Sequence, residues 1–90
     1  MPSVPAGSFG FRIRLHVEDN LNLATSAKIY YTKPDGTTGS WTATLGLNDI
    51  DYTLQSGDIL STDTGVWLLQ GEVTWGSATV KTQKVTLDVV

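Results

Sequence analysis

Apolar and polar residues alternate along several short runs of this chain, and this period of two constrains the fold more than any other feature. In the longest run every second residue is apolar: Phe9, Phe11, Ile13, Leu15 and Val17. Because a strand points successive side chains to opposite faces, the pattern predicts a strand with one buried face. Similar alternation in residues 27–32, 41–45, 50–54 and 66–75 predicts an all-β chain.

The middle of the chain predicts a β-hairpin. Residues 27–32 and 41–45 flank a Pro34-Asp35-Gly36 sequence. Proline suits the second position of a type I turn, aspartate can accept a hydrogen bond from its own backbone, and glycine tolerates a positive φ. The parity of the residue numbers, odd or even, decides which face of a strand a side chain occupies. It assigns one apolar face to each strand, with these residues in the core: Ala27, Ile29, Tyr31, Trp41, Ala43 and Leu45.

The second half predicts three further strands. Residues 50–54 form one, with Asp49 and Asp51 facing water, and residues 55–65 form a crossover between sheets, anchored by Ile59 and Leu60. Residues 66–75 are apolar enough for a central strand, which turns at Gly76-Ser77 into the last strand. In that last strand the inward residues change parity between Lys81 and Lys84, which predicts a bulge or break, as in a strand that changes sheets. The inward residues are Ala78, Val80, Val85, Leu87 and Val89.

About six to seven short strands with regular turns predict an immunoglobulin-like sandwich of two antiparallel sheets. A small closed barrel is the alternative. Residues 1–8 contain two prolines and predict an extended N-terminal arm outside the domain, which then spans residues 9–90. Leu21 and Leu23 are expected to plug one end of the core.

Length and composition limit the function. Ninety residues make one domain, and the absence of cysteine excludes disulfides and thiolate zinc sites. A net charge of −3 with no basic stripe argues against nucleic acid or an anionic membrane surface as a partner. The sequence shows no secretory signal pattern and no apolar run of spanning length, so we expect a soluble protein.

No catalytic, cofactor or metal residue is predicted. His16 is the only histidine, and its place on the polar face of residues 9–17 favours a surface residue over a general base. Four aspartates with no base among them suggest a calcium site, but their spacing matches no calcium loop, so we expect solvated acids: Asp49, Asp51, Asp58 and Asp63.

The aromatic residues raise the alternative of a carbohydrate-binding module. Parity assigns almost every large ring to a core face, and Tyr30 is the only strand aromatic expected to point outward. Tyr30 and the loops 34–40 and 55–65 would then form the sugar-binding surface. An enzyme built on His16 is the third possibility.

The sequence also resembles a known family. The resemblance covers about residues 24–75 and is carried by four motifs: Ala24-Thr25-Ser26-Ala27-Lys28-Ile29-Tyr30-Tyr31; Lys33-Pro34-Asp35-Gly36-Thr37 with Trp41; Ile50-Asp51-Tyr52-Thr53 with Gly57-Asp58-Ile59; and Gly65-Val66-Trp67-Leu68-Leu69-Gln70. These resemble immunoglobulin-like domains of tailed-bacteriophage structural proteins, including N-terminal domains of baseplate upper proteins and short stand-alone virion proteins. Unlike the longer members, the chain stops at Val90, without a receptor-binding region.

The resemblance implies a non-enzymatic virion component, made in the host cytoplasm and present in many symmetric copies or as a homo-oligomer. It would act in the tail, baseplate, neck or capsid decoration by binding other virion proteins through an arm and strand edges. The residues expected to contact partners are Pro2, Val4, Pro5, Tyr30, Val89 and Val90. We also expect the arm to become ordered on assembly.

Overall fold

The computed structural model describes residues 3–17, 24–60, 62–82 and 84–90. All regular structure in these ranges is β-strand, as predicted. The strands are β1 (Ser3–Val4), β2 (Arg12–His16), β3 (Ser26–Thr32), β4 (Thr38–Thr42), β5 (Thr44–Leu45), β6 (Asp49–Thr53), β7 (Gly65–Trp75), β8 (Ala78–Lys81) and β9 (Val85–Val89). The described residues include no helix long and apolar enough to cross a bilayer.

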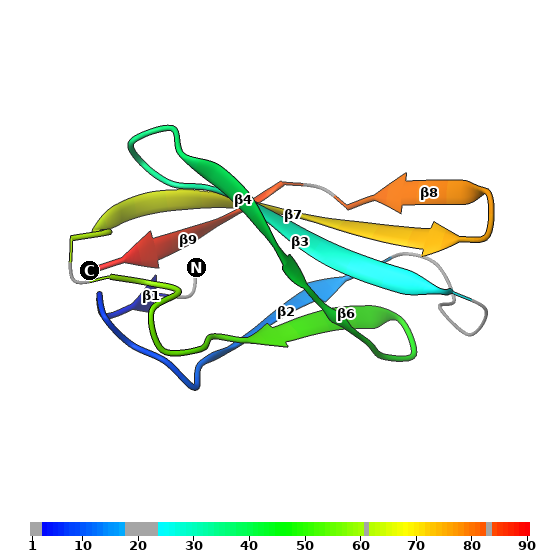
Figure 1. Ribbon diagram of the computed structural model, residues 1–90, viewed down its shortest axis with the longest axis horizontal. Helices are drawn as coiled ribbons and strands as arrows, with labels where there is room; N and C mark the ends of the chain where they lie inside the picture. The colour runs from blue at the N-terminus through cyan, green and yellow to red at the C-terminus, as the bar shows by residue number, and fades with distance from the viewer. Residues whose placement is uncertain (1–2, 18–23, 61, 83) are drawn as a thin grey trace.

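Two sheets pack face to face in a sandwich (Figure 1). The larger sheet has the order β1-β9-β7-β3-β4, with β8 also paired to β7, and the smaller has the order β2-β6-β5. All pairs are antiparallel except the parallel pair of β1 and β9. This arrangement confirms the predicted all-β sandwich of two sheets, although the described residues form nine strands where six to seven were expected and include one parallel pair. The central position predicted for residues 66–75 is also confirmed, because β7 pairs with β3, β8 and β9.

The central hairpin has the predicted turn. The amide of Gly36 donates to the Lys33 carbonyl at 2.9 Å, and the φ of Gly36 is +90°. Asp35 Oδ1 accepts a hydrogen bond from the Thr37 amide at 2.9 Å, which lowers the pKa of the Asp35 carboxyl below its ordinary 3.8. Positive φ strains residues with a Cβ, so glycine suits this position.

The predicted return strand 41–45 is in fact divided between the two sheets. β4 pairs with β3 in the larger sheet, and β5 pairs with β6 in the smaller sheet. The chain therefore crosses at Ala43, which is buried and whose amide donates to the Ala27 carbonyl at 3.0 Å. Continuous alternation of apolar and polar residues does not reveal a change of sheet, because the inward face is the same core on both sides.

The last strand is interrupted where the parity change predicted, but it does not change sheets. Lys81 pairs with Glu72 and Val85 pairs with Leu69, so between these two pairings this part of the chain is one residue longer than β7, as in a bulge. Both β8 and β9 pair with β7 in the same sheet. The prediction that the inward residues of β8 are buried was wrong: β8 lies at one end of the molecule, largely beyond the smaller sheet, and is exposed throughout.

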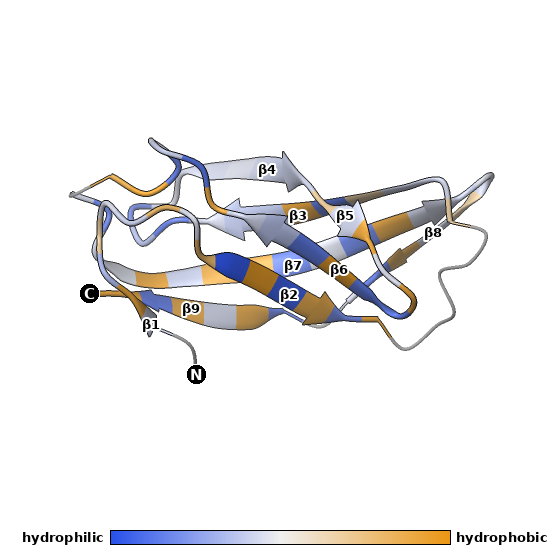
Figure 2. Ribbon diagram, turned by 90° about the horizontal axis from the view of Figure 1, so that it is seen from below, coloured by the Kyte–Doolittle hydropathy of each residue, from blue (hydrophilic) through white to orange (hydrophobic). Residues whose placement is uncertain are grey.

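Two expectations for the N-terminal region were also wrong. Ser3–Val4 is not an arm outside the domain, since it pairs with β9 and Val4 is only 1% exposed. The strand predicted for residues 9–17 is shorter: Ile13, Leu15 and Val17 are buried, but Phe9 and Phe11 precede β2 and are exposed. Figure 2 shows the alternation along β2 as blue and orange bands. The predicted plug of leucines at residues 21 and 23 lies outside the described residues.

The two sheets approach each other closely at Gly71 of β7. A Cβ at this position would lie 2.7 Å from Ile50 Cδ1 and 3.3 Å from Leu15 Cδ1, which are side chains of the smaller sheet. Ile50 has no exposed surface and fills this space. The crossover 55–65 does connect the two sheets, but only Ile59 of its two expected anchors is buried, while Leu60 is half-exposed.

Candidate functional site

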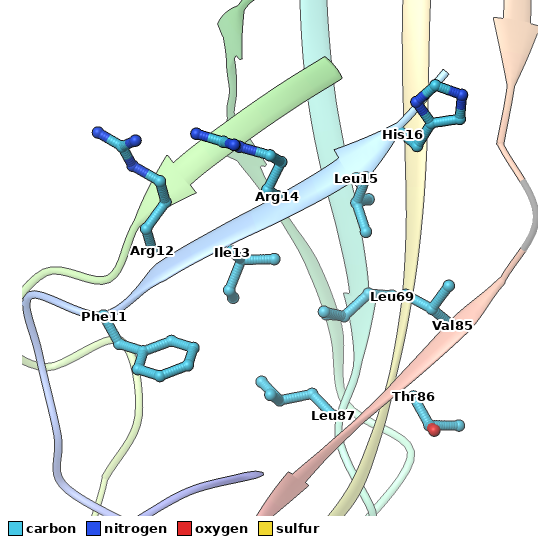
Figure 3. Close-up of a pocket in the computed structure, with 10 residues that line it drawn as sticks. All are labelled: Phe11, Arg12, Ile13, Arg14, Leu15, His16, Leu69, Val85, Thr86 and Leu87. Carbon is cyan, nitrogen blue, oxygen red and sulfur yellow. The ribbon is translucent and has the colours of Figure 1, made fainter. Parts of the chain in front are cut away.

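An apolar groove lies between the sheets where β2 faces β9 (Figure 3). Its volume is about 440 Å³. Phe11, Ile13 and Leu15 approach it from the smaller sheet, and Leu69 and Leu87 from the larger. Phe11 is 37% exposed at its mouth. The groove is therefore a gap in the side of the sandwich, lined mostly by apolar side chains.

The groove is open because β2 is an edge strand. Among the described residues β2 pairs with β6 alone. The Val17 amide donates to Asn48 and the Leu54 amide to Phe11, so the odd-numbered residues of this register exchange hydrogen bonds with β6. The backbone N–H and C=O groups of Arg12 and Arg14 consequently point to the open edge, where no described strand receives them.

The outward face of β2 is basic. Arg12, Arg14 and His16 alternate with the buried residues of this strand. Arg14 Nε lies 3.9 Å from Asp49 Oδ2, but its side chain remains 55% exposed. His16 Nδ1 lies 3.6 Å from Asp49 Oδ1, an ion pair when the imidazole is protonated. In Figure 3 Arg12 and Arg14 point away from the groove, whereas Ile13 and Leu15 point into it.

A second surface is the outer face of the larger sheet. Tyr30 is 38% exposed there, as parity predicted, and its hydroxyl donates to Glu72 Oε1 at 3.3 Å. Leu68 and Val66 are exposed on the same face. A shallow hollow of about 160 Å³ adjoins Tyr30 and is lined by Thr32, Leu68, Leu69, Gln70 and Lys84. This face combines one aromatic ring with polar neighbours.

The structure separates the six residues predicted to contact partners. Tyr30, Pro5 and Val90 are exposed. Val4 and Val89 lie opposite each other in the β1–β9 pair and are buried in the core, so their side chains are not a contact surface. Pro2 lies outside the described residues. The inward position of Val89 agrees with the alternation of residues 85–89.

Four other large aromatic rings are packed together between the sheets: Tyr31, Trp41, Tyr52 and Trp67. The rings of Trp41 and Tyr52 stack with centroids 4.9 Å apart, and Tyr31 lies 4.6 Å from Trp41 and 5.4 Å from Trp67. Lys33 Nζ lies 5.4 Å from the Trp67 ring and 3.4 Å from Asp63 Oδ2. These four rings therefore belong to the core, as parity predicted, and not to a sugar-binding platform.

The predicted acidic residues stabilise local structure. Asp58 Oδ2 accepts hydrogen bonds from the Tyr52 hydroxyl at 2.5 Å and the Gln55 amide at 2.7 Å. Burial, together with this bond to Asp58, raises the pKa of Tyr52 to about 12. Asp63 Oδ2 accepts from the Leu60 amide at 2.9 Å. In the described part of the chain no three His, Cys, Asp or Glu residues gather in a way that could hold a metal ion.

Sequence reasoning missed the groove. Its floor is made of residues that parity assigned to an ordinary core, and only the order of strands in the two sheets shows that β2 has an uncovered edge. The one available signal was the mixture of arginine and apolar residues in residues 12–15, because charged residues are common on edge strands.

No protein-family model and no curated protein matches this sequence. The resemblance to phage domains therefore stays a prediction.

Proposed function

We propose that this protein is a non-enzymatic structural component of a bacteriophage virion that acts through protein–protein contacts. The observation that carries the contact role is the apolar groove beside the unpaired edge of β2. Exposed strand edges offer backbone hydrogen bonds to a partner, and an apolar groove offers buried area, so together they suit a protein ligand. The phage assignment rests on the four sequence motifs described above.

Within a particle, many symmetric copies would each present this edge to a neighbouring virion protein. The N-terminal segment would not act as the free contact arm expected from the sequence. Since Val4 is buried beside β9, residues 3–4 stabilise the domain, and the exposed neighbours Pro5 and Val90 are the contacts left at this end.

The test is the composition of purified particles. Particles from a phage that encodes this chain should contain it in a fixed ratio to other virion proteins, measured by quantitative mass spectrometry. Particles made after deletion of its gene should lack a density of the size of this domain in electron cryomicroscopy. Absence of the chain from purified wild-type particles would contradict the proposal.

A carbohydrate-binding module is the second candidate, favoured by the exposed Tyr30 ring beside a hollow with polar residues. An exposed ring can stack on a sugar, and polar neighbours can hydrogen-bond its hydroxyls. Binding on a glycan array that is lost in Tyr30→Ala and retained in Tyr30→Phe and Leu47→Ala would place this candidate first. Leu47→Ala serves as a control because Leu47 is an exposed apolar residue in the turn before β6, outside the hollow beside Tyr30.

A further inference from the structure

We infer that the open edge of β2 binds an extended segment of a partner protein in which apolar residues alternate with acidic residues. This inference rests on the proposed protein–protein function and specifies the partner's chemistry. The segment would add to the smaller sheet as a fourth strand, on the side of β2 opposite β6.

An added strand needs unpaired backbone groups at the edge of β2. The register with β6 turns the N–H and C=O groups of Arg12 and Arg14 away from the smaller sheet. An added strand would satisfy these groups at a strand separation of about 4.8 Å. Edge addition therefore requires no rearrangement of the β2–β6 pair.

An added strand also needs space for its inward side chains, and the groove provides it. A strand beside β2 would point every second side chain toward Leu87 and Leu69, in the direction that Ile13 and Leu15 take in Figure 3. The volume of about 440 Å³ falls within the usual range of about 300–1,000 Å³ for binding pockets. Apolar side chains at alternate positions would fill this space and cover the exposed ring of Phe11.

The positive charge of β2 favours acidic side chains at the outward positions of the added strand. Residues directly opposite on neighbouring strands share a face, so the other side chains of the added strand would lie beside Arg12 and Arg14. Asp49 and Asp51 lie on β6, two strand separations away from the added strand. Salt screens charges over about 8–10 Å, so the repulsion between these aspartates and acidic side chains of the added strand is weak. Arg12 has no ion-pair partner among the described residues. Acidic side chains are therefore favoured.

The same charges disfavour a second copy of this chain as the occupant. An antiparallel pair of two β2 strands would bring the arginines of one copy beside Arg12, Arg14 or His16 of the other. Like charges on opposed residues destabilise a strand pair. A heterologous acidic segment avoids this repulsion.

The experiment uses two synthetic peptides with the 90-residue protein labelled with ¹⁵N. One peptide alternates valine with glutamate over about nine residues, long enough to cover β2, and the other has lysine in place of glutamate. We expect the glutamate peptide to bind and to slow hydrogen exchange at the Arg12 and Arg14 amides. The lysine peptide should bind at least about tenfold more weakly, because the charged pairs become repulsive.

Three variants separate strand addition from other binding. Arg14→Pro removes an edge N–H without removing a β2–β6 bond, so peptide binding should be lost while the spectrum of the rest of the protein is retained. Arg12→Glu with Arg14→Glu should reverse the preference toward the lysine peptide without a backbone change. Lys28→Glu reverses a single charge at an exposed position of β3, away from the β2 edge, and should leave binding unchanged.

The inference is overturned if the glutamate peptide does not bind, if both peptides bind equally, or if Arg14→Pro leaves binding intact. It is also overturned if the free protein forms a dimer that Arg14→Pro dissociates, which would make a second copy the occupant. These results leave the proposed function standing as long as the chain is found in purified particles. Peptide binding by a chain that is absent from particles would instead reject the virion assignment alone.

Discussion

One long side of the sandwich is closed and the other is open. On one side the chain itself crosses from β4 to β5 at Ala43, and the rings of Trp41, Trp67, Tyr31 and Tyr52 fill the space between the sheets. On the other side β2 has no further described strand beside it, and a groove remains. Beyond β9 the described part of the chain adds only β1, which contributes two residues.

This difference assigns stability to one side and binding to the other. A side closed by covalent continuity and large buried rings cannot open without losing much of the core. An edge with unpaired backbone groups and partly exposed apolar side chains gains free energy when a partner covers it. Substitutions on the closed side should therefore lower the free energy of unfolding more than substitutions on the open side.

The largest effect is expected for Trp67→Ala on the closed side. Trp67 has no exposed surface, stacks with Trp41 and donates from Nε1 to the Asp63 carbonyl at 2.9 Å. Loss of such a ring costs about 3–5 kcal/mol, close to the total stability of many small domains. Phe11→Ala, its counterpart on the open side, should cost about 1 kcal/mol because the ring is partly exposed. Equal losses in urea unfolding would remove the distinction between the sides.

Gly71→Ala should have the next largest effect. Its added Cβ would lie 2.7 Å from Ile50 Cδ1, and Ile50 is fully buried and cannot move freely. Overpacking of this kind costs about 1–3 kcal/mol. Gly71→Ala combined with Ile50→Val, which removes the contacting methyl group, should recover part of that loss in the same unfolding measurement. A single variant as stable as the native protein would show that the sheets are not closely packed here.

An effect of similar size is expected for the ion pair between Lys33 and Asp63. Both side chains are mostly buried, and Asp63 also accepts a bond from the Leu60 amide. Asp63→Asn should cost about 1–3 kcal/mol, since it leaves the Lys33 charge without its partner. Lys33→Met keeps the contact with Trp67, and a double-mutant cycle of the two changes isolates the ion pair. A coupling energy of zero would show that the two residues act independently.

The smallest effect is the pH dependence of the hairpin turn. The Thr37 amide bond lowers the pKa of Asp35 in the folded protein relative to the unfolded chain. This contribution to stability is fully present above the ordinary pKa of 3.8 and is lost as pH falls through the folded-state pKa. The Thr37 amide resonance should titrate at that lower pKa in the native protein and show no such step in Asp35→Asn, whose side-chain oxygen can still accept the bond. A Thr37 titration at or above 3.8 would contradict the prediction.

Several elements could be predicted because their determinants are local. The turn at residues 33–36 depends on the angles and hydrogen bonds of three adjacent residues, and it formed as expected. The inward residues of β7 follow from the period of two alone. The break between β8 and β9 was predicted from a parity change, and the pairings of these two strands with β7 differ in register by one residue.

Other features depend on which strands become neighbours. Val4 was expected in an arm because two prolines flank it, yet pairing with β9 buries it. Phe9 and Phe11 continue the alternation of β2 but precede the paired strand and stay exposed. In each case burial is decided by a partner distant in the sequence, which periodicity does not specify.

The sequence by itself determined an all-β sandwich, its central strand, its hairpin turn and the outward position of Tyr30, because side-chain alternation and turn chemistry act over a few residues. The tertiary structure alone decided where the chain changes sheets, that β1 belongs to the domain and that β2 is left as an edge. Those outcomes are set by packing between distant segments. The candidate binding site is one of them, since a groove exists only where one segment fails to cover another.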